Sequence, residues 1–333
     1  MVRETVFAAV LALALTAVGN NAAGSAQNST PAAPSSAKPA TIPFARLTPD
    51  ARLPAALGPG AVAAPDAIWT ADPSSSTLIR LDAKKNTADP PVALTGPACA
   101  SLAVAFDTVW VPLCTGHAVA RISLKDSTVS ATLKTDVAAP DGRIADAVGS
   151  IWVLTNRRGV LSRIDPDTNT AVAEIYVAGG ATAVAAGENA LWITSDEGNR
   201  LTRVSPHTNE TIETIDVGPR PGRLAVGEGG VWTLNRGDGS VTRVDPSTNK
   251  VVATIPVDPA AASGEIAAGA GSIWISAPGL PVIRIDPRTN RTVQKFTGEG
   301  GGAILVAHGS LWVAAGPKVT WRLDPVLVAG MRP

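Results

Sequence analysis

Five arginines in two short stretches of the chain have the chemistry of a site that binds an anion. A guanidinium group offers several N–H donors in a planar fork, and this fork matches the oxygens of a carboxylate or a phosphate. We therefore predict that an anionic small molecule or a peptide carboxylate binds where these side chains meet. The five arginines are Arg143, Arg157, Arg220, Arg223 and Arg236.

An ordinary solvated surface is the alternative interpretation of the same arginines. Carboxylates in loops that belong to the same rim would neutralise them in ion pairs, without any ligand. The carboxylates concerned are Asp141, Asp196, Glu197 and Asp238. Whether the arginines form one site depends on the elements that carry them.

Those elements form a repeat of about forty residues, which two independent markers define. Tryptophans recur with spacings of 41, 42, 40, 40, 42 and 38 residues, and arginines recur with spacings of 41, 42, 40, 40, 41 and 38. Each unit reads as four short β-rich runs separated by turn-forming residues, so it predicts four strands. Seven such units predict an all-β, seven-bladed β-propeller of four-stranded antiparallel blades. The markers are Trp69, Trp110, Trp152, Trp192, Trp232, Trp274 and Trp312, and Arg80, Arg121, Arg163, Arg203, Arg243, Arg284 and Arg322.

A turn motif, Asp-Pro-x-Thr-Asn, follows the repeated arginine in several units, for example at residues 245–249. Aspartate accepts backbone hydrogen bonds at the start of such a turn, proline presets φ, and asparagine tolerates the left-handed conformation. We expect the tryptophan to pack between blades. We expect the repeated arginine to pair with a carboxylate or a carbonyl on a neighbouring strand.

The repeat places the charged residues at the start of the innermost strands, near the mouth of the central channel. Nine residues before the successive tryptophans stand Gly60, Ser101, Arg143, Ala183, Arg223, Glu265 and Ala303. Six residues before them, Asp146 is the one polar residue in the series. Because an unpaired buried carboxylate is costly, we expect Asp146 to pair with Arg143, another arginine or a water; a metal ligand is the alternative. The predicted binding site therefore includes Glu265 and Asp146.

The N-terminal part of the chain predicts export. Residues 6–18 form a 13-residue, almost wholly apolar run with small residues after it, so residues 1–26 are interpreted as a signal peptide. An uncleaved signal anchor is the alternative. Residues 27–40 are rich in Ala, Ser and Pro and predict a disordered linker. The propeller then occupies residues 41–333, outside the cytoplasm, in a secreted or periplasmic protein.

Closure of the ring requires an outer strand for the last blade. After Asp324 and Pro325 the seventh unit lacks its fourth strand. We predict that an N-terminal strand, residues 41–47, supplies it. Residues 326–329 are the competing candidate.

The two cysteines of the chain predict a disulfide. If the hairpin turn lies between Phe106 and Asp107, residues whose numbers sum to 213 face one another, and 99 plus 114 is 213. An exported protein meets an oxidising environment, so we expect a Cys99–Cys114 disulfide in blade two. Two free buried thiols are the alternative.

Composition excludes several classes of function. Lys plus Arg equals Asp plus Glu at 28 each, which argues against nucleic acid as a partner and against a membrane surface beyond the signal segment. The histidines are scattered, and HExxH, a catalytic triad order and a glycine-rich phosphate loop do not occur. We therefore expect no metal site and no cofactor, and a monomer that binds an unknown small molecule or peptide.

The units at residues 231–257 and 191–217, VWTLNRGDGSVTRVDPSTNKVVATIPV and LWITSDEGNRLTRVSPHTNETIETIDV, resemble YVTN-type and virginiamycin B lyase-like (streptogramin lyase) propellers. The resemblance covers roughly residues 60–325. It implies a magnesium-dependent elimination that linearises a cyclic depsipeptide, with histidines and a glutamate at one face. This chain has no Glu-x-His motif, so no catalytic residue is carried over. Lactonase propellers bind a divalent metal through inward carboxylates, and the inner strands here offer Asp146 and Glu265.

Three functions are therefore in competition. The favoured one is an exported propeller that binds a ligand and performs no chemistry. The alternative is a divalent-metal enzyme, using Mg or Ca, of the lyase or lactonase type. The third is a purely structural scaffold or envelope component.

Overall fold

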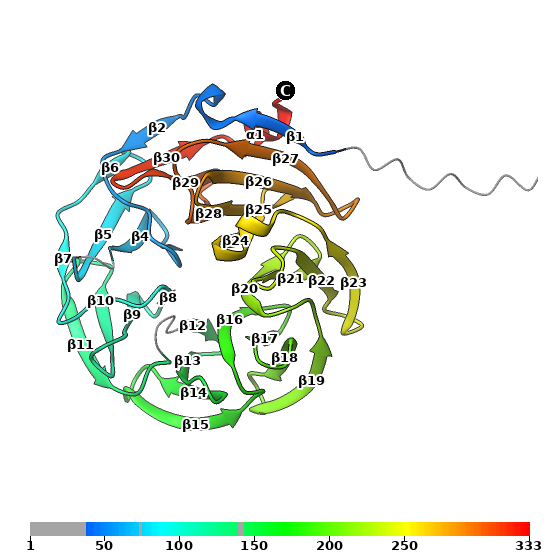
Figure 1. The fold of residues 1–333 in the computed structure, drawn as a ribbon. Coiled ribbons are helices and arrows are strands. Elements are labelled where there is room, and N and C mark those ends of the chain that lie inside the picture. Colours follow the sequence, from blue (N-terminus) through cyan, green and yellow to red (C-terminus); the bar gives the residue numbers. More distant parts are fainter. Residues whose placement is uncertain (1–37, 73–74, 139–142) are drawn as a thin grey trace, which may run out of the picture. The chain divides into compact units, whose positions relative to one another are not determined.

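The computed structural model describes residues 38–72, 75–138 and 143–333, and one compact unit runs from Lys38 to Pro333. This unit consists of seven blades in a ring, with the first strand of each repeat innermost (Figure 1). The predicted seven-bladed β-propeller is confirmed. The predicted signal peptide (1–26) and nearly all of the predicted linker (27–40) lie outside the described residues.

Each blade is an antiparallel sheet whose strands follow one another in the sequence. From the inner to the outer edge, blade two contains β8 (Ala103–Ala105), β9 (Thr108–Leu113), β10 (Ala118–Ser123) and β11 (Val129–Lys134). Blade three contains β12 (Ile144–Ala147), β13 (Ser150–Asn156), β14 (Val160–Asp165) and β15 (Thr170–Tyr176). Blade four contains β16 (Ala181–Gly187), β17 (Ala190–Ser195), β18 (Arg200–Ser205) and β19 (Glu210–Asp216). Blade five contains β20 (Pro221–Gly227), β21 (Gly230–Asn235), β22 (Val241–Asp245) and β23 (Lys250–Ile255); blade six contains β24 (Glu265–Gly269), β25 (Ser272–Ala277), β26 (Leu280–Asp286) and β27 (Arg291–Thr297).

Blades one and seven depart from this pattern at their outer edges. Blade one consists of β3 (Val62–Ala63), β4 (Ala67–Asp72) and β5 (Thr77–Asp82), and its outer strand is split into β6 (Thr87–Ala88) and β7 (Val92–Ala93). Pro90 and Pro91 stand at the break, where proline cannot donate to the ladder. Blade seven has β28 (Ile304–Ala307), β29 (Ser310–Gly316) and β30 (Val319–Leu323).

The repeated tryptophans form the core between blades, as the sequence predicts. All seven are completely buried in the second strand of their blade. In six blades the indole N–H donates to the carbonyl five residues earlier, as Trp232 does to Gly227 at 2.9 Å. Trp69 in blade one makes no such bond, since its inner strand β3 is only two residues long. The tryptophan therefore fills space and also fastens the end of the inner strand.

The repeated arginine connects each blade to the next one. Arg203 lies over the ring of Trp192 and donates through Nη1 to the Pro246 carbonyl and to Asn249 Oδ1, both at 2.8 Å, in the turn of the following blade. We call this contact the arginine clasp. It joins five of the seven blade junctions in the described part of the chain; the arginines are Arg121, Arg163, Arg203, Arg243 and Arg322, and the asparagines are Asn169, Asn209, Asn249, Asn290 and Asn86.

The prediction that residues 41–47 form the outer strand of blade seven is wrong. β1 (Ala40–Pro43) instead runs parallel to β27 at the edge of blade six, with Ile42 opposite Phe296. The outer position of blade seven is taken by β2 (Ala51–Leu53), which pairs antiparallel with β30. The short 3-10 helix η1 (Phe44–Arg46) lies between them, and Phe44 stacks on Trp321 with ring centroids 4.5 Å apart.

The competing candidate, residues 326–329, is helical instead of extended. It belongs to α1 (Pro325–Gly330). Asp324 caps this helix by accepting from Val326 N at 2.7 Å, and Pro325 occupies the first helical position, where its missing N–H costs nothing.

The structure contains the Cys99–Cys114 disulfide, with 5.2 Å between the Cα atoms. The register is more complex than the sequence suggests. Ala103 does face Trp110, so the sum of 213 holds there, but Ala98 faces Leu113 and the sum falls to 211. The two cysteines are therefore diagonal neighbours across a shift in register, close enough to be bridged.

Candidate functional site

Three charged side chains from three different blades meet where the inner strands begin. Arg223, in β20, donates through Nε to Glu265 Oε1 at 2.6 Å. Arg143, directly before β12, donates through Nη2 to the same oxygen at 3.3 Å. Glu265 is the first residue of β24. We call these residues the inner triad, and it holds two guanidinium groups on one carboxylate.

The inner triad is largely shielded from water. The side chains of Arg143, Arg223 and Glu265 are 8, 12 and 11% exposed. Removing such charges from water costs several kcal/mol per ion, which their mutual attraction repays only with good geometry. The other four blades place Gly60, Ser101, Ala183 and Ala303 at this position. The fold therefore does not require charges at this position.

Local structure holds the backbone beside Glu265 and Arg143 in place. Before Glu265, the 3-10 helix η2 (Pro259–Ser263) is capped by the Asp258 side chain, and Gly264 packs so tightly that a Cβ there would lie 2.5 Å from the Ser276 carbonyl. After Arg143, the Ile144 amide donates to Ser101 Oγ of blade two at 3.3 Å.

Arg157 lies in a separate ion pair with Asp196 of blade four, at 3.3 Å. The Arg157 side chain is half exposed, whereas that of Asp196 is 10% exposed. Asp196 and Glu197 fold over Gly180, where a Cβ would lie 2.6 Å from Glu197 Cγ. This is the carboxylate pairing that the solvated-surface interpretation expects, so Arg157 is a weaker candidate than the triad.

Arg220 and Arg236 lie side by side in blade five. The Arg236 amide donates to the Arg220 carbonyl at 2.8 Å, and the Arg220 amide donates to Asn199 Oδ1 at 2.8 Å. The Arg236 side chain crosses Gly222, where a Cβ would lie 2.2 Å from Nε. Both arginines therefore belong to the same end of β20 as Arg223. Asn199 shapes this loop, a role that the sequence does not reveal.

Asp146 lies in β12 and is exposed to solvent. Among the described residues it makes no ion pair, either with Arg143 or with another arginine. Surrounding protein nevertheless removes part of the water around the carboxylate and raises the pKa of Asp146.

Two other residues near the candidate site are Asp141, named above, and Asn235. Asp141 lies outside the described residues. Asn235 is completely buried at the end of β21, where its amide donates to Ser240 Oγ and Thr242 Oγ1 at 2.9 and 3.0 Å, so its role is structural.

In the part of the chain that is described, no group of three or more His, Cys, Asp or Glu residues is arranged to hold a metal ion. No described helix is long and apolar enough to cross a bilayer.

Comparison with known proteins agrees with the architecture. No family profile matches the chain, and no curated protein matches it. Among solved structures, a streptogramin B lyase aligns over 80% of this chain and 93% of its own, with a TM-score of 0.66 and 19% identity. In fold, the chain is similar to this lyase propeller. Selenomethionine-substituted virginiamycin B lyase from Staphylococcus aureus aligns with a TM-score of 0.68 and 17% identity, over 80% of this chain and 94% of that one.

A third structure with a similar fold is a catalytically inactive variant of the virginiamycin B lyase from Staphylococcus aureus with quinupristin. It covers 81% of this chain and 95% of its own, with a TM-score of 0.66 and 17% identity. At these identities the likeness establishes the fold and no more.

Proposed function

We propose that this protein is an exported binding propeller that holds an anionic small molecule or a peptide carboxylate at the inner triad. The single observation that carries the proposal is the convergence of Arg143 and Arg223 on one oxygen of Glu265. Two guanidinium groups therefore lie beside a single carboxylate. A guanidinium carries several N–H donors in a planar fork, which matches the oxygens of a carboxylate or a phosphate. In this proposal a ligand carboxylate or phosphate binds at the two guanidinium groups beside Glu265.

Neighbouring side chains extend this site at the same end of blade five. The Arg236 side chain lies across Gly222, and the Arg236 amide donates a hydrogen bond to the Arg220 carbonyl. Long arginine side chains at the rim attract anions from solution before the ligand reaches the buried pair. Asp146, farther along β12, adds a carboxylate that favours a ligand with a positive group as well.

A thermal-shift screen tests this proposal. The full chain is heated with a panel of carboxylates, phosphates and short peptides, together with neutral and cationic analogues. We expect at least one anion to raise the melting temperature, since a ligand that binds only the folded state stabilises it. Arg143→Gln and Arg223→Gln should abolish that rise, whereas Arg288→Gln, an exposed arginine in an outer turn, should leave it unchanged. An anion whose effect survives both substitutions would refute the site.

Export is the second part of the proposal. A disulfide supports it, because structural disulfides persist in oxidising compartments. The N-terminal apolar run of residues 6–18 supports it as well. Fractionation of expressing cells, with N-terminal sequencing of the released protein, tests it. Full-length protein confined to the cytoplasm would contradict export.

The likeness in fold to streptogramin lyases favours one alternative, a divalent-metal lyase or lactonase. Elemental analysis of the purified protein, followed by incubation with a cyclic depsipeptide and with lactones in the presence of Mg and Ca, distinguishes it. Turnover that depends on the metal would replace the binding proposal.

A further inference from the structure

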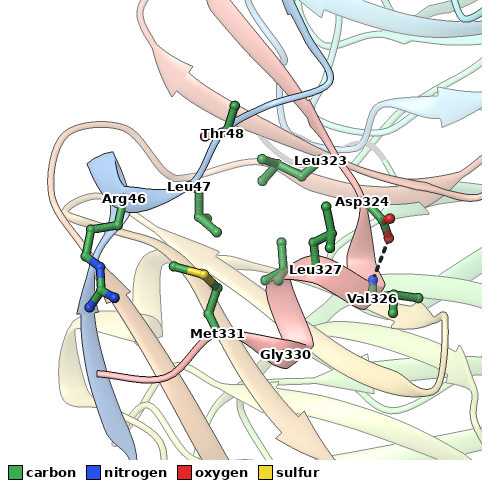
Figure 2. A pocket seen from close by; sticks show the side chains of 10 residues that line it. Arg46, Leu47, Thr48, Leu323, Asp324, Val326, Leu327, Gly330 and Met331 are labelled. Atoms are coloured by element: carbon green, nitrogen blue, oxygen red, sulfur yellow. Dashed lines mark hydrogen bonds between the residues drawn. The ribbon is translucent and has the colours of Figure 1, made fainter.

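A cavity lies at the outer edge of the molecule, away from the inner strands. It has a volume of about 410 Å³ and lies between η1 and α1. Clefts of about 300–1,000 Å³ are the usual size of small-molecule sites. In Figure 2 the side chains of Leu47, Leu323, Leu327 and Met331 point toward one common space.

The walls of this cavity are apolar and partly adaptable. Leu47, Leu323 and Val328 belong to a buried cluster and are 6, 1 and 1% exposed. On the open side, Leu327 of α1 is 64% exposed. Met331 is a flexible side chain that adjusts to different shapes. The cavity therefore offers a fixed apolar floor and movable walls to an alkyl chain.

One charged residue lies at each end of the cavity, and the two differ in whether they already bond to another residue. Arg46 lies at one end, beside Met331, and makes no hydrogen bond or ion pair with any residue of the described ranges. Asp324 lies at the other end, where its Oδ1 accepts from Val326 N as the cap of α1. Charge complementarity therefore favours an anionic head group at Arg46.

We propose that this cavity binds a free fatty acid of short to medium chain length. Its carboxylate pairs with Arg46, and its alkyl chain lies along Leu47, Met331 and Leu327 toward Leu323. This site shares no residue with the inner triad and does not depend on the function proposed there.

Calorimetric titration with decanoate, below its micelle concentration, tests the proposal on the full chain. We expect saturable binding of one decanoate per protein. Arg46→Gln should weaken decanoate binding by about tenfold or more, because a charge-assisted contact is lost, and should leave binding of neutral decanol unchanged. Leu327→Asp should weaken both ligands.

Both substitutions are at positions where the fold tolerates them, and a matched control exists. Arg46 and Leu327 are exposed, and Val252 on β23 is an exposed apolar residue, 48% exposed, on another surface. Val252→Asp should bind decanoate as the wild type does. Three results would overturn the proposal: no saturable decanoate binding by the wild type, equal affinity in Arg46→Gln, or binding only to anionic vesicles. Filling of the cavity by a second copy, seen as a dimer by sedimentation that Leu327→Asp disrupts, would overturn it as well.

Discussion

At the scale of single residues, Glu265 is the charge on which the inner triad depends. Its carboxylate neutralises part of two largely buried guanidinium groups, so its loss leaves both without their shared anion. We expect Glu265→Gln to lower the free energy of unfolding by about 2 kcal/mol, less than for a fully buried charge because the amide still accepts a hydrogen bond. Urea denaturation measures this. The exposed Glu299→Gln serves as the control, and equal stability of the two variants would contradict the triad.

Asp146 predicts a dependence on pH. Because its pKa is raised, the folded protein binds this proton more tightly than the unfolded chain does. The free energy of unfolding therefore falls as the pH rises from the usual aspartate pKa through the raised pKa of Asp146 in the folded protein, where the carboxylate ionises. Asp146→Asn should raise the melting temperature at neutral pH. The gain should vanish below the usual aspartate pKa of about 3.9, where the carboxyl is protonated in both states. Identical pH profiles of variant and wild type would show that the carboxylate is fully solvated.

At the scale of elements, the arginine clasp joins neighbouring blades. The Arg203 contact with Asn249 combines a charge-assisted hydrogen bond with a turn in which Asn249 has a φ of 58°. We expect Asn249→Ala to lower stability by about 1.5 kcal/mol more than Asn189→Ala does. Asn189 is the matched control, because it has a φ of 54° in an exposed turn and receives no clasp. If the two substitutions cost the same, the backbone conformation of asparagine explains the motif and the clasp contributes nothing.

The disulfide acts on one element of blade two, the segment that enters its inner strand. It closes a loop with a sequence separation of 15 residues, so the loss of unfolded-state entropy corresponds to about 3 kcal/mol. The Cys99→Ser, Cys114→Ser double variant should be less stable by about this amount. A reductant should destabilise the wild type equally and leave the double variant unchanged. A double variant as stable as the oxidised wild type would contradict this account.

At the scale of the whole molecule, the two repeated arginines that form no clasp in the described part of the chain bond within their own blades. Arg80 of blade one pairs with Asp66 and Asp89 of its own blade. Arg284 of blade six bonds to Ser272 and to Gln294. The C-terminal segment compensates in blade six, where the Gln294 amide donates to the carbonyls of Val328, Ala329 and Met331. Both terminal segments of the described unit therefore bind the region of blades six and seven.

The repeat explains how much of this architecture could be predicted from sequence. Tryptophan and arginine recur because every blade must fill the same space and reach the same turn, so the count of blades follows from spacing. The expected arginine partner, a carboxylate or a carbonyl on a neighbouring strand, is instead a carbonyl and an asparagine Oδ1 in the turn of the next blade. Residues 38–60 carry neither marker, so spacing does not locate the strand that they contribute to blade seven. The predicted strand at residues 41–47 lies before β2, which is the strand that pairs there.

The site was less predictable for a physical reason. Spacing identifies Arg143, Arg223 and Glu265 as equivalent positions, but their meeting across the ring depends on side-chain reach, which no period encodes. Asp146 shows that a residue of an inner strand can still be exposed, which the repeat does not reveal. The pairing of Arg157 with Asp196 follows from loop conformation, which is set by Gly180.

The most direct measurement is the crystal structure of the protein with the anion that the thermal-shift screen selects. The account predicts an oxygen of that anion within about 3 Å of a guanidinium nitrogen of Arg143 or Arg223. An anion that occupies another part of the molecule, with the contacts of Glu265 unchanged, would contradict it.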